Sequence, residues 1–192
     1  VMPAYNAEKT LEKTYNEIPK DIVDDIILTD DHSSDKTVEV ARRLGLKLFI
    51  HERNKGYGGN QKTLYAAALK MGAEIIIMVH PDNQYNTKNL PVIVQMIRDE
   101  KADFMLGSRM ARARENGMPW WKFIGNRFLT KLQNYIYGTN LSELHSGLRA
   151  FRSDILAKMP YNTFSDDFVF DSECIAWLVA QKATIKEWPV DC

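Results

Sequence analysis

Short apolar runs alternate with longer segments of helical period through the first half of the chain. Four runs are short, partly β-branched and bounded by polar turns, as buried strands are: 26–28, 46–50, 75–79 and 104–106. Between them, apolar residues share a helical face in four sets: Leu11, Tyr15 and Ile18; Val38, Ala41 and Leu44; Leu64, Ala67, Ala68 and Met71; Leu90, Ile93, Val94 and Ile97. The repeated strand and helix predicts an α/β fold, with a mostly parallel sheet covered by helices on both faces.

The pattern changes after Ser108. A basic loop of small residues over 109–117 precedes a helix predicted over 119–137, which Gly138 ends. Further elements are predicted as strands over 148–151 and 184–188 and a helix over 170–180. We therefore expect a single domain of two fused lobes, 1–108 and 109–192, and 192 residues suffice for one such domain.

Composition narrows the class of protein. The 25 basic and 25 acidic residues balance, so the basic excess of a dedicated nucleic-acid-binding protein is missing. The two cysteines, Cys174 and Cys192, cannot form a disulfide framework or a zinc site, and they suit a reducing compartment. The longest apolar run, 75–79, is far shorter than a membrane span, and no signal peptide is visible.

The chain opens on Val1-Met2-Pro3, which looks like the end of a strand running into a turn. We expect the sequence to be part of a longer protein, so these remarks on membrane segments apply to this part alone.

A polar segment follows each of the first five predicted strands. In an open parallel sheet, ligands bind at the carboxyl ends of the strands, so these segments should share one rim. They are 3–8, 29–35, 53–60, 80–85 and 107–109. Carboxylates, glycines and an arginine gathered there indicate a nucleotide with its phosphates and a cation.

These loops also have structural interpretations. The run 31–35 could be a turn with a helix cap, the glycines of 53–60 could supply turn dihedrals, and His80 could be a cap or a core contact. Asp82 lies too early to cap the following helix. Neither GxxxxGK[ST] nor a GxGxxG after the first strand is present, which argues against a phosphate-binding loop of that kind and against a dinucleotide dehydrogenase.

Several segments, in order, resemble glycosyltransferase family 2 enzymes of the GT-A fold, a Rossmann-like α/β architecture. They are 1–8, 29–37, 54–59, the loop around Asp82, 107–109 and 146–151. The dolichyl-phosphate mannosyltransferase-like subgroup is the most similar. The resemblance implies metal-assisted, inverting transfer of a sugar from a UDP- or GDP-linked donor to a polyprenyl phosphate such as dolichyl or undecaprenyl phosphate, with Mg²⁺ or Mn²⁺ as cofactor.

The resemblance also implies that the lobe 1–108 binds the nucleotide sugar and the lobe 109–192 binds the acceptor, and it implies roles for individual residues. The donor-binding residues would be Pro3, Tyr5, Asn6, Glu8, Asp30, Asp31, Lys62 and Gln84. The catalytic residues would be Asp82, Arg109 and Arg127, with Asp82 as metal ligand. His80 replaces the first Asp of the family's Asp-x-Asp motif and is a candidate second ligand.

Basic and aromatic residues mix over 109–131, which suits a membrane interface and an anionic lipid phosphate. The relevant residues are Arg109, Arg112, Arg114, Trp120, Trp121, Lys122, Arg127 and Lys131. The alternative is an ordinary core stripe made by Trp120, Ile124, Phe128 and Leu132. The first interpretation predicts a protein at the cytoplasmic face of a membrane, attached peripherally.

Three rival functions stay open. A hydroxyl acceptor would need a carboxylate base, for which Asp166, Asp167, Asp171 and Glu173 are candidates, although carboxylates are also common in a solvated first helical turn. A sugar-phosphate nucleotidyltransferase would need a glycine-rich basic loop after the first strand, and 3–8 is not one. A domain that binds a nucleotide sugar without turnover is the third.

Overall fold

The computed structural model of the chain describes residues 1–108, 120–144 and 146–190, without the side chains of residues 122 and 123. The strands are β1 Met2–Ala4, β2 Ile27–Asp30, β3 Lys47–Ile50, β4 Ile75–Met78, β5 Phe104–Ser108, β6 Arg149–Arg152 and β7 Ile185–Pro189. The α-helices are α1 Leu11–Glu17, α2 Thr37–Arg43, α3 Gly56–Lys70, α4 Leu90–Arg98, α5 Trp120–Tyr137, α6 Ser153–Lys158 and α7 Phe170–Ala180. Short 3₁₀ turns occupy Thr87–Asn89 and Tyr161–Thr163.

The described strands form two adjoining sheets, a parallel one of three strands and a mixed one of four strands. The order β1-β2-β3 is parallel, and in the order β4-β6-β5-β7 only β6 runs antiparallel to its neighbours. The two groups join at β1 and β4, because the Val1 nitrogen donates to Ile77 O at 2.6 Å and Val79 N donates to Val1 O at 3.0 Å. This offset pair is the hydrogen-bond pattern of parallel strands. The predicted fold class is confirmed.

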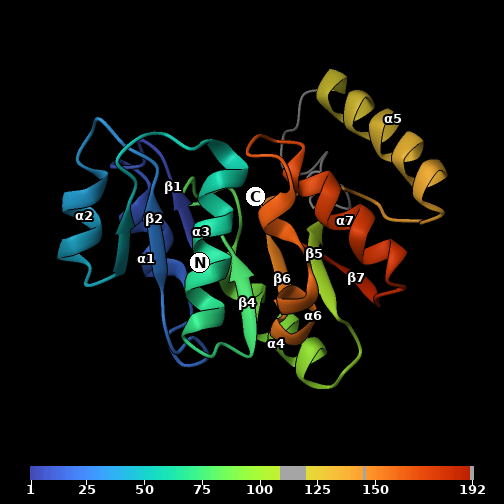
Figure 1. The fold of residues 1–192 in the computed structure, drawn as a ribbon, viewed down its shortest axis with the longest axis horizontal. Helices are drawn as coiled ribbons and strands as arrows, with labels where there is room; N and C mark the ends of the chain where they lie inside the picture. The colour runs from blue at the N-terminus through green and yellow to red at the C-terminus, as the bar shows by residue number, and fades with distance from the viewer. Residues whose placement is uncertain (109–119, 145, 191–192) are drawn as a thin grey trace.

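Helices cover both faces of the sheet, as Figure 1 shows. One hydrophobic cluster packs α3, α6 and α7 against the sheet, and the helices α1, α2 and α4 belong to the other two clusters. Neighbouring strand residues divide between the faces: Ile27 packs with α3, and Leu28 packs with α1 and α2. Because successive strand side chains point to opposite faces, the continuous apolar runs of the sequence supply both cores.

The two predicted lobes share a core. The largest hydrophobic cluster joins Leu64 of α3 and Met78 of β4 to Phe151 of β6 and Leu178 of α7. Residues on both sides of position 108 therefore fold on one core, as expected of a single domain. The assignment of one lobe to the donor and the other to the acceptor stays a prediction.

One predicted strand is less buried than expected. The run 46–50 was predicted as a buried strand, but Phe49 is 41% exposed and Ile50 is 48% exposed. The reason is the sheet order, which places β3 at the edge with β2 as its single strand neighbour. The apolar content of a run does not reveal its place in the sheet.

Helix α5 stands at one side of the molecule (Figure 1), and three of its amide side chains bind other parts of the chain. Asn126 donates to Glu143 Oε1 at 3.2 Å, Gln133 donates to Ser172 Oγ at 3.3 Å, and Asn134 donates to Leu141 O at 2.8 Å. The helix ends at Gly138, whose φ of 65° is the left-handed conformation expected of a helix stop. The predicted helix over this segment is therefore confirmed.

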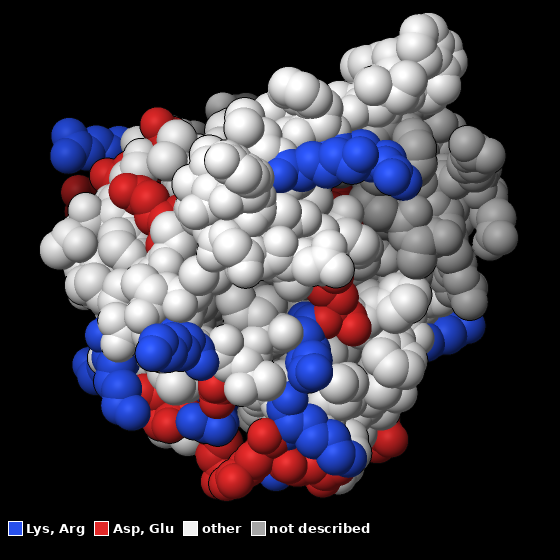
Figure 2. All heavy atoms as spheres, turned by 90° about the vertical axis from the view of Figure 1, so that its right-hand side faces the viewer, with Lys and Arg blue, Asp and Glu red and all other residues white. Residues whose placement is uncertain are grey.

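The apolar residues of α5 face outward. Those more than one third exposed are Trp120, Trp121, Ile124, Phe128, Leu129, Leu132, Tyr135 and Ile136, at 48–87%. The core-stripe interpretation of this helix is therefore wrong. Figure 2 views this side of the molecule: uncharged residues dominate its upper part, where α5 lies, and most charged side chains lie lower. Within the described ranges, no helix is both long and apolar enough to cross a membrane.

Candidate active site

A pocket of about 320 Å³ lies at the carboxyl ends of β1 and β4, beside the first turn of α3. It is lined by Pro3, Ala4, Tyr5, Asn6, Ala7, Thr10, Asp31, Asn54, Gly56, Tyr57, Asn60, His80, Pro81, Asp82 and Phe168. These residues come from the end of β1, the loops after the first four strands, the first turns of α3 and the segment before α7. Its position is that expected for a ligand in an open α/β sheet.

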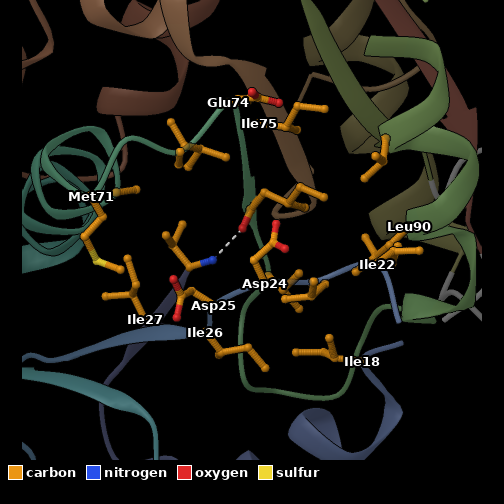
Figure 3. Close-up of a pocket in the computed structure, with 18 of the residues that line it drawn as sticks. Ile18, Ile22, Asp24, Asp25, Ile26, Ile27, Met71, Glu74, Ile75 and Leu90 are labelled. Carbon is orange, nitrogen blue, oxygen red and sulfur yellow. Dashed lines mark hydrogen bonds between the residues drawn. The ribbon is translucent and has the colours of Figure 1, made fainter. Parts of the chain in front are cut away.

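A second pocket, of about 420 Å³, lies at the opposite ends of the same strands (Figure 3). Its walls are largely aliphatic, with Ile18, Ile22, Ile26 and Leu90 among them. It is larger than the rim pocket but lies away from the carboxyl ends of the strands, where ligands of such sheets bind. The rim pocket is therefore the candidate active site.

The loop after β1 is fixed by hydrogen bonds to the loop after β2. Asn6 Oδ1 accepts the Ser34 N–H at 2.9 Å, and Glu8 Oε2 accepts the Lys36 N–H at 3.0 Å. Asn6 has a φ of 52°, which asparagine tolerates better than most residues, and it lines the pocket. Glu8 is not among the lining residues, so its carboxylate holds the loop in shape.

The two aspartates at the carboxyl end of β2 occupy different environments. Asp30 is 1% exposed, lies outside the lining set, and accepts the Ser33 N–H at 2.9 Å. Asp31 lines the pocket, and its carboxylate accepts bonds from the backbone N–H groups of Lys55 and Gly56 at 2.8 and 3.0 Å. Asp31 therefore fixes the start of α3 at the pocket wall. The sequence predicted both residues but could not separate their roles.

The glycines at the start of α3 permit a close approach of the segment 165–170. The Gly58 N–H donates to Asp166 O at 2.8 Å. A Cβ on Gly58 would lie 2.4 Å from Ser165 O and 2.9 Å from the Phe170 Cβ, and real side chains do not approach so closely. The Asp166 carbonyl thus accepts the Gly58 N–H at the start of the helix. The sequence suggested that these glycines supply turn dihedrals, and the structure shows that Gly58 also allows close packing.

Gly58→Ala is expected to lower the free energy of unfolding by about 1–3 kcal/mol, because a fixed backbone would have to move to admit one methyl group. Gly125→Ala is the matched control, since a Cβ there meets nothing within 4 Å. In the interior of α5 that change should be neutral or stabilise by up to about 1 kcal/mol. Urea unfolding of both variants is the measurement, and a Gly58→Ala variant as stable as the parent would contradict the packing role.

Lys62 lies outside the lining set, away from the donor contact that the resemblance implied. Its Nζ pairs with Asp166 Oδ1 at 2.7 Å and also bonds Phe164 O. Glu173 Oε2 accepts the Ser165 N–H at 2.7 Å, and Asp167 Oδ1 accepts the Val169 N–H at 2.8 Å. Three of the four carboxylates proposed as candidate bases therefore make contacts that hold the segment before α7 in place. They are Asp166, Asp167 and Glu173.

Asp171, the fourth, belongs to a buried network. It forms an ion pair with Arg149, which is 2% exposed, and accepts bonds from Tyr57 Oη at 2.7 Å and from Gln61 Nε2 at 3.2 Å. Burial alone would lower the pKa of Arg149, but Asp171 reverses this, and the pKa rises above its ordinary value. The guanidinium stays charged, so the charge of Asp171 is neutralised by Arg149. Asp171 therefore differs from a carboxylate that is exposed to solvent in the first turn of a helix.

His80 is held between two neighbours at the pocket wall. Its ring stacks on Tyr57, with centroids 5.5 Å apart and planes 5° apart. On another side, a Cβ on Gly147 would lie 2.6 Å from His80 Cδ2, so only glycine fits there. Burial lowers the pKa of His80 below its ordinary value, although the Asp82 carboxylate acts in the opposite direction. At neutral pH the ring is neutral and keeps a lone pair.

Asp82 is exposed at the pocket, and its Oδ1 accepts the Gln84 N–H at 3.0 Å. Its Oδ2 has no partner among the described residues, and the Gln84 side chain lies outside the lining set. No group of three or more His, Cys, Asp or Glu that could hold a metal occurs in the described part of the chain. A cation here would therefore take most of its oxygen ligands from water and phosphates. For Mg²⁺, which prefers oxygen, the protein would contribute Asp82, whereas Mn²⁺ would tolerate His80 as a second ligand better.

The structure brings together some of the predicted residues and separates others. In the pocket are Pro3, Tyr5, Asn6, Asp31, His80 and Asp82, and outside it are Glu8, Asp30, Lys62 and Gln84. Arg127 lies on α5, and Arg109, with Arg112 and Arg114, lies outside the described residues. The sequence interpretation gave no separate roles to the pocket residues Asn54, Tyr57, Asn60 and Phe168. Asn54, Tyr57 and Asn60 belong to the segment 53–60 that the strand pattern predicted at the rim as a loop, although residues from Gly56 on start α3, and Phe168 carried no such signal.

The fold and the pocket define an α/β protein with a ligand site at the carboxyl ends of its strands. Residues 1–159 match the family model described as Glycosyl transferase family 2, so the chain belongs to this family of glycosyltransferases. An uncharacterized protein of Methanocaldococcus jannaschii is 33% identical over 191 residues, which cover 99% of this chain and 79% of the relative.

Two named relatives act on dolichyl phosphate according to their names. The UDP-N-acetylglucosamine–dolichyl-phosphate N-acetylglucosaminyltransferase of Methanococcus voltae is 27% identical, over 99% of this chain and 83% of the relative. The dolichyl-phosphate hexose transferase of Haloferax volcanii is 28% identical, over 81% of this chain and 66% of the relative.

A solved structure shares the fold. The glucosyl-3-phosphoglycerate synthase of Mycobacterium tuberculosis, crystallised with Mn²⁺, UDP and phosphoglyceric acid, superposes with a TM-score of 0.73. The match covers 98% of this chain and 66% of that chain, at 18% sequence identity. This similarity confirms the GT-A-like architecture.

Proposed function

We propose that this glycosyltransferase transfers a sugar, with inversion, from a UDP- or GDP-linked donor to a polyprenyl phosphate at a membrane surface. The observation that carries the proposal is helix α5, which turns polar residues toward the protein and a row of apolar residues outward. In water such a surface is unfavourable, whereas the interfacial region of a bilayer would bury it.

The donor would occupy the rim pocket. Of the residues that line it, Pro3, Tyr5, Asn6 and Asp31 would hold the nucleoside, and Asp82 would face the phosphates. The volume of about 320 Å³ lies at the lower end of the range for small-molecule sites. In this arrangement residues 1–108 supply most of the donor site, and later residues supply the acceptor side.

Asp82 and His80 would hold a divalent cation, which would neutralise the charge that grows on the leaving diphosphate. Asp82 offers a free carboxylate oxygen, and His80 offers a neutral ring fixed between Tyr57 and Gly147. Of the two arginines that the resemblance implies near phosphates, Arg109 would add positive charge at the diphosphate and Arg127 at the acceptor phosphate.

The network around Asp171 supports a phosphate acceptor. A hydroxyl acceptor needs a base to take its proton, but the Asp171 carboxylate is already paired with Arg149 and accepts bonds from Tyr57 and Gln61. A phosphate acceptor is anionic near neutral pH and needs no base. The names of the two relatives above, which include dolichyl phosphate, point the same way.

The exposed basic residues of α5, Arg127 and Lys131, suit an anionic lipid headgroup beside the apolar row. Each basic residue near such a surface contributes about 1 kcal/mol, and salt screens this contribution. The proposal therefore includes a peripheral position at the cytoplasmic face of the membrane.

Arg127→Ala is expected to lower transfer to a short-chain polyprenyl phosphate about tenfold or more while changing the dissociation constant of the nucleotide less than twofold. The reason is that Arg127 would contact the acceptor phosphate rather than the donor. Arg42→Ala is the control, because Arg42 is exposed on α2. Transfer is measured with the lipid phosphate and with a panel of sugar and protein hydroxyl acceptors.

Efficient transfer to a hydroxyl acceptor with an inert lipid phosphate would contradict the acceptor assignment. Equal effects of Arg127→Ala and Arg42→Ala on transfer would remove Arg127 from the acceptor site. Donor hydrolysis assayed without acceptor separates a turnover defect from a donor-binding domain that has no activity.

A further inference from the structure

Three of the acceptor positions on the Asp31 carboxylate are already used inside the protein. Oδ1 is bonded to His51 Nδ1 at 2.7 Å and to the Lys55 N–H at 2.8 Å, and Oδ2 accepts the Gly56 N–H at 3.0 Å. An ionised carboxylate has about four such positions. One position therefore remains, on Oδ2, and Asp31 lines the donor pocket.

His51 fixes which oxygen is left. The side chains of His51 and Asp31 are each 5% exposed, and because a carboxylate can only accept, Nδ1 of His51 is the donor. On the other side of the ring, Nε2 lies 2.9 Å from Thr63 Oγ1 of α3. With both ring nitrogens engaged the imidazole cannot turn, so Oδ1 stays directed at His51 and Lys55.

A hydrogen-bond donor lies beside the free position. The Gly56 N–H is shared between Asp31 Oδ2 at 3.0 Å and Asn54 Oδ1 at 2.9 Å, so the two side chains meet there. The Asn54 amide nitrogen carries two N–H groups and has no partner among the described residues. Asn54 also lines the pocket, which therefore presents one acceptor next to one donor.

We propose that His51 is a positioning residue that gives the donor pocket a preference for uracil over guanine. The inference rests on the proposed function and names its donor as a uridine diphosphate sugar. Uracil presents one N–H, at N3, between two carbonyl oxygens, which matches the single acceptor of Asp31 and the amide of Asn54. Guanine presents two adjacent donors, N1–H and the N2 amine, and the second would find Oδ1 already occupied. An unpaired donor in a closed site lowers affinity.

The test is calorimetric titration of the purified chain, in Mg²⁺, with UDP, GDP, CDP and N3-methyl-UDP. UDP is expected to bind at least tenfold more tightly than the other three. GDP carries one donor too many, and CDP and N3-methyl-UDP lack the N3–H. Binding needs no acceptor and no turnover, so this result does not depend on the transfer assay.

Variants at position 51 test the positioning role. His51→Leu removes the bond to Oδ1, so UDP affinity should fall about tenfold and the ratio of UDP to GDP affinity should shrink. His51→Asn can place an amide N–H near the position of Nδ1 and should restore most of both. Thermal unfolding is followed in parallel, because a purely structural role would lower stability without changing the ratio.

Several outcomes would overturn the inference: GDP binding as tightly as UDP, N3-methylation or CDP making no difference, or His51→Leu changing both affinities by the same factor. UDP-selective binding together with an inert polyprenyl phosphate would uphold the inference while the acceptor proposal fails. Failure to bind any of the nucleotides would reject both.

Discussion

Asp82→Asn is expected to lower sugar transfer by about two orders of magnitude or more, which corresponds to roughly 2.7 kcal/mol of barrier. Asparagine keeps an Oδ1 that can accept the Gln84 N–H, so the loop after β4 should hold its shape. What the variant loses is the negative charge on an exposed side chain at the rim pocket. Transfer is measured over a range of Mg²⁺ and Mn²⁺ concentrations.

The control for this variant is Asp99→Asn. Asp99 is also exposed, its carboxylate accepts bonds from Gln95 and Lys101, and it follows α4 outside the pocket. Its replacement should leave transfer within about twofold of the parent. If Asp82→Asn turned over as fast as the parent and responded equally to a chelator, Asp82 would not be a metal ligand.

Asp171→Asn is expected to lower the free energy of unfolding by about 3–5 kcal/mol, because it leaves the charge of Arg149 buried without its counter-ion. Arg149 is 2% exposed, its Nε donates to Ser146 O at 2.8 Å, and its Nη2 has no hydrogen-bond partner. No other ion pair of this guanidinium is present among the described residues. Urea unfolding, with the slope compared between variants, is the measurement.

The double variant Arg149→Met with Asp171→Leu separates charge from packing. It removes both charges, so it should be more stable than Asp171→Asn alone. Arg152→Met is the control for losing an arginine of β6, since Arg152 pairs with Asp103 and Asp154 and is more exposed than Arg149. Its cost should stay within about 1 kcal/mol for each exposed pair. An Asp171→Asn variant as stable as the parent would show that the buried pair does not hold α7 in place.

The positions of the strands and helices could be predicted from the sequence, because secondary structure depends mainly on residues that are close together in the chain. The alternation of apolar runs with helical faces identified the repeated strands and helices, and Pro119 and Gly138 marked the ends of the helix at 120–137. Once the strands were assigned, the rule that ligands meet the carboxyl ends of parallel strands placed Tyr5, Asp31 and Asp82 at one rim. The pocket contains all three.

The edge position of β3 and the outward face of α5 could not be read from local pattern. An apolar stripe on a helix has the same sequence whether it packs on a core or faces away from it. For α5 the decision came from partners distant in sequence, such as Ser172 for Gln133 and Glu143 for Asn126, which bind its polar face. The apolar stripe of α5 therefore lies outside, and the aromatic residues that the core-stripe alternative placed in the core are exposed.

The sequence by itself determined the order of strands and helices, the rim that holds the polar loops, and the family to which the motifs belong. Only the tertiary structure decided the role of each polar side chain, because a carboxylate acts according to the donors that surround it. Asp30 and Asp31 are adjacent, yet one is buried against Ser33, and the other faces the pocket with its bonds fixed by His51. The donors on Asp31, which are His51 and Lys55, lie 20 and 24 residues away along the chain, and folding of the sheet is what brings them to the same rim.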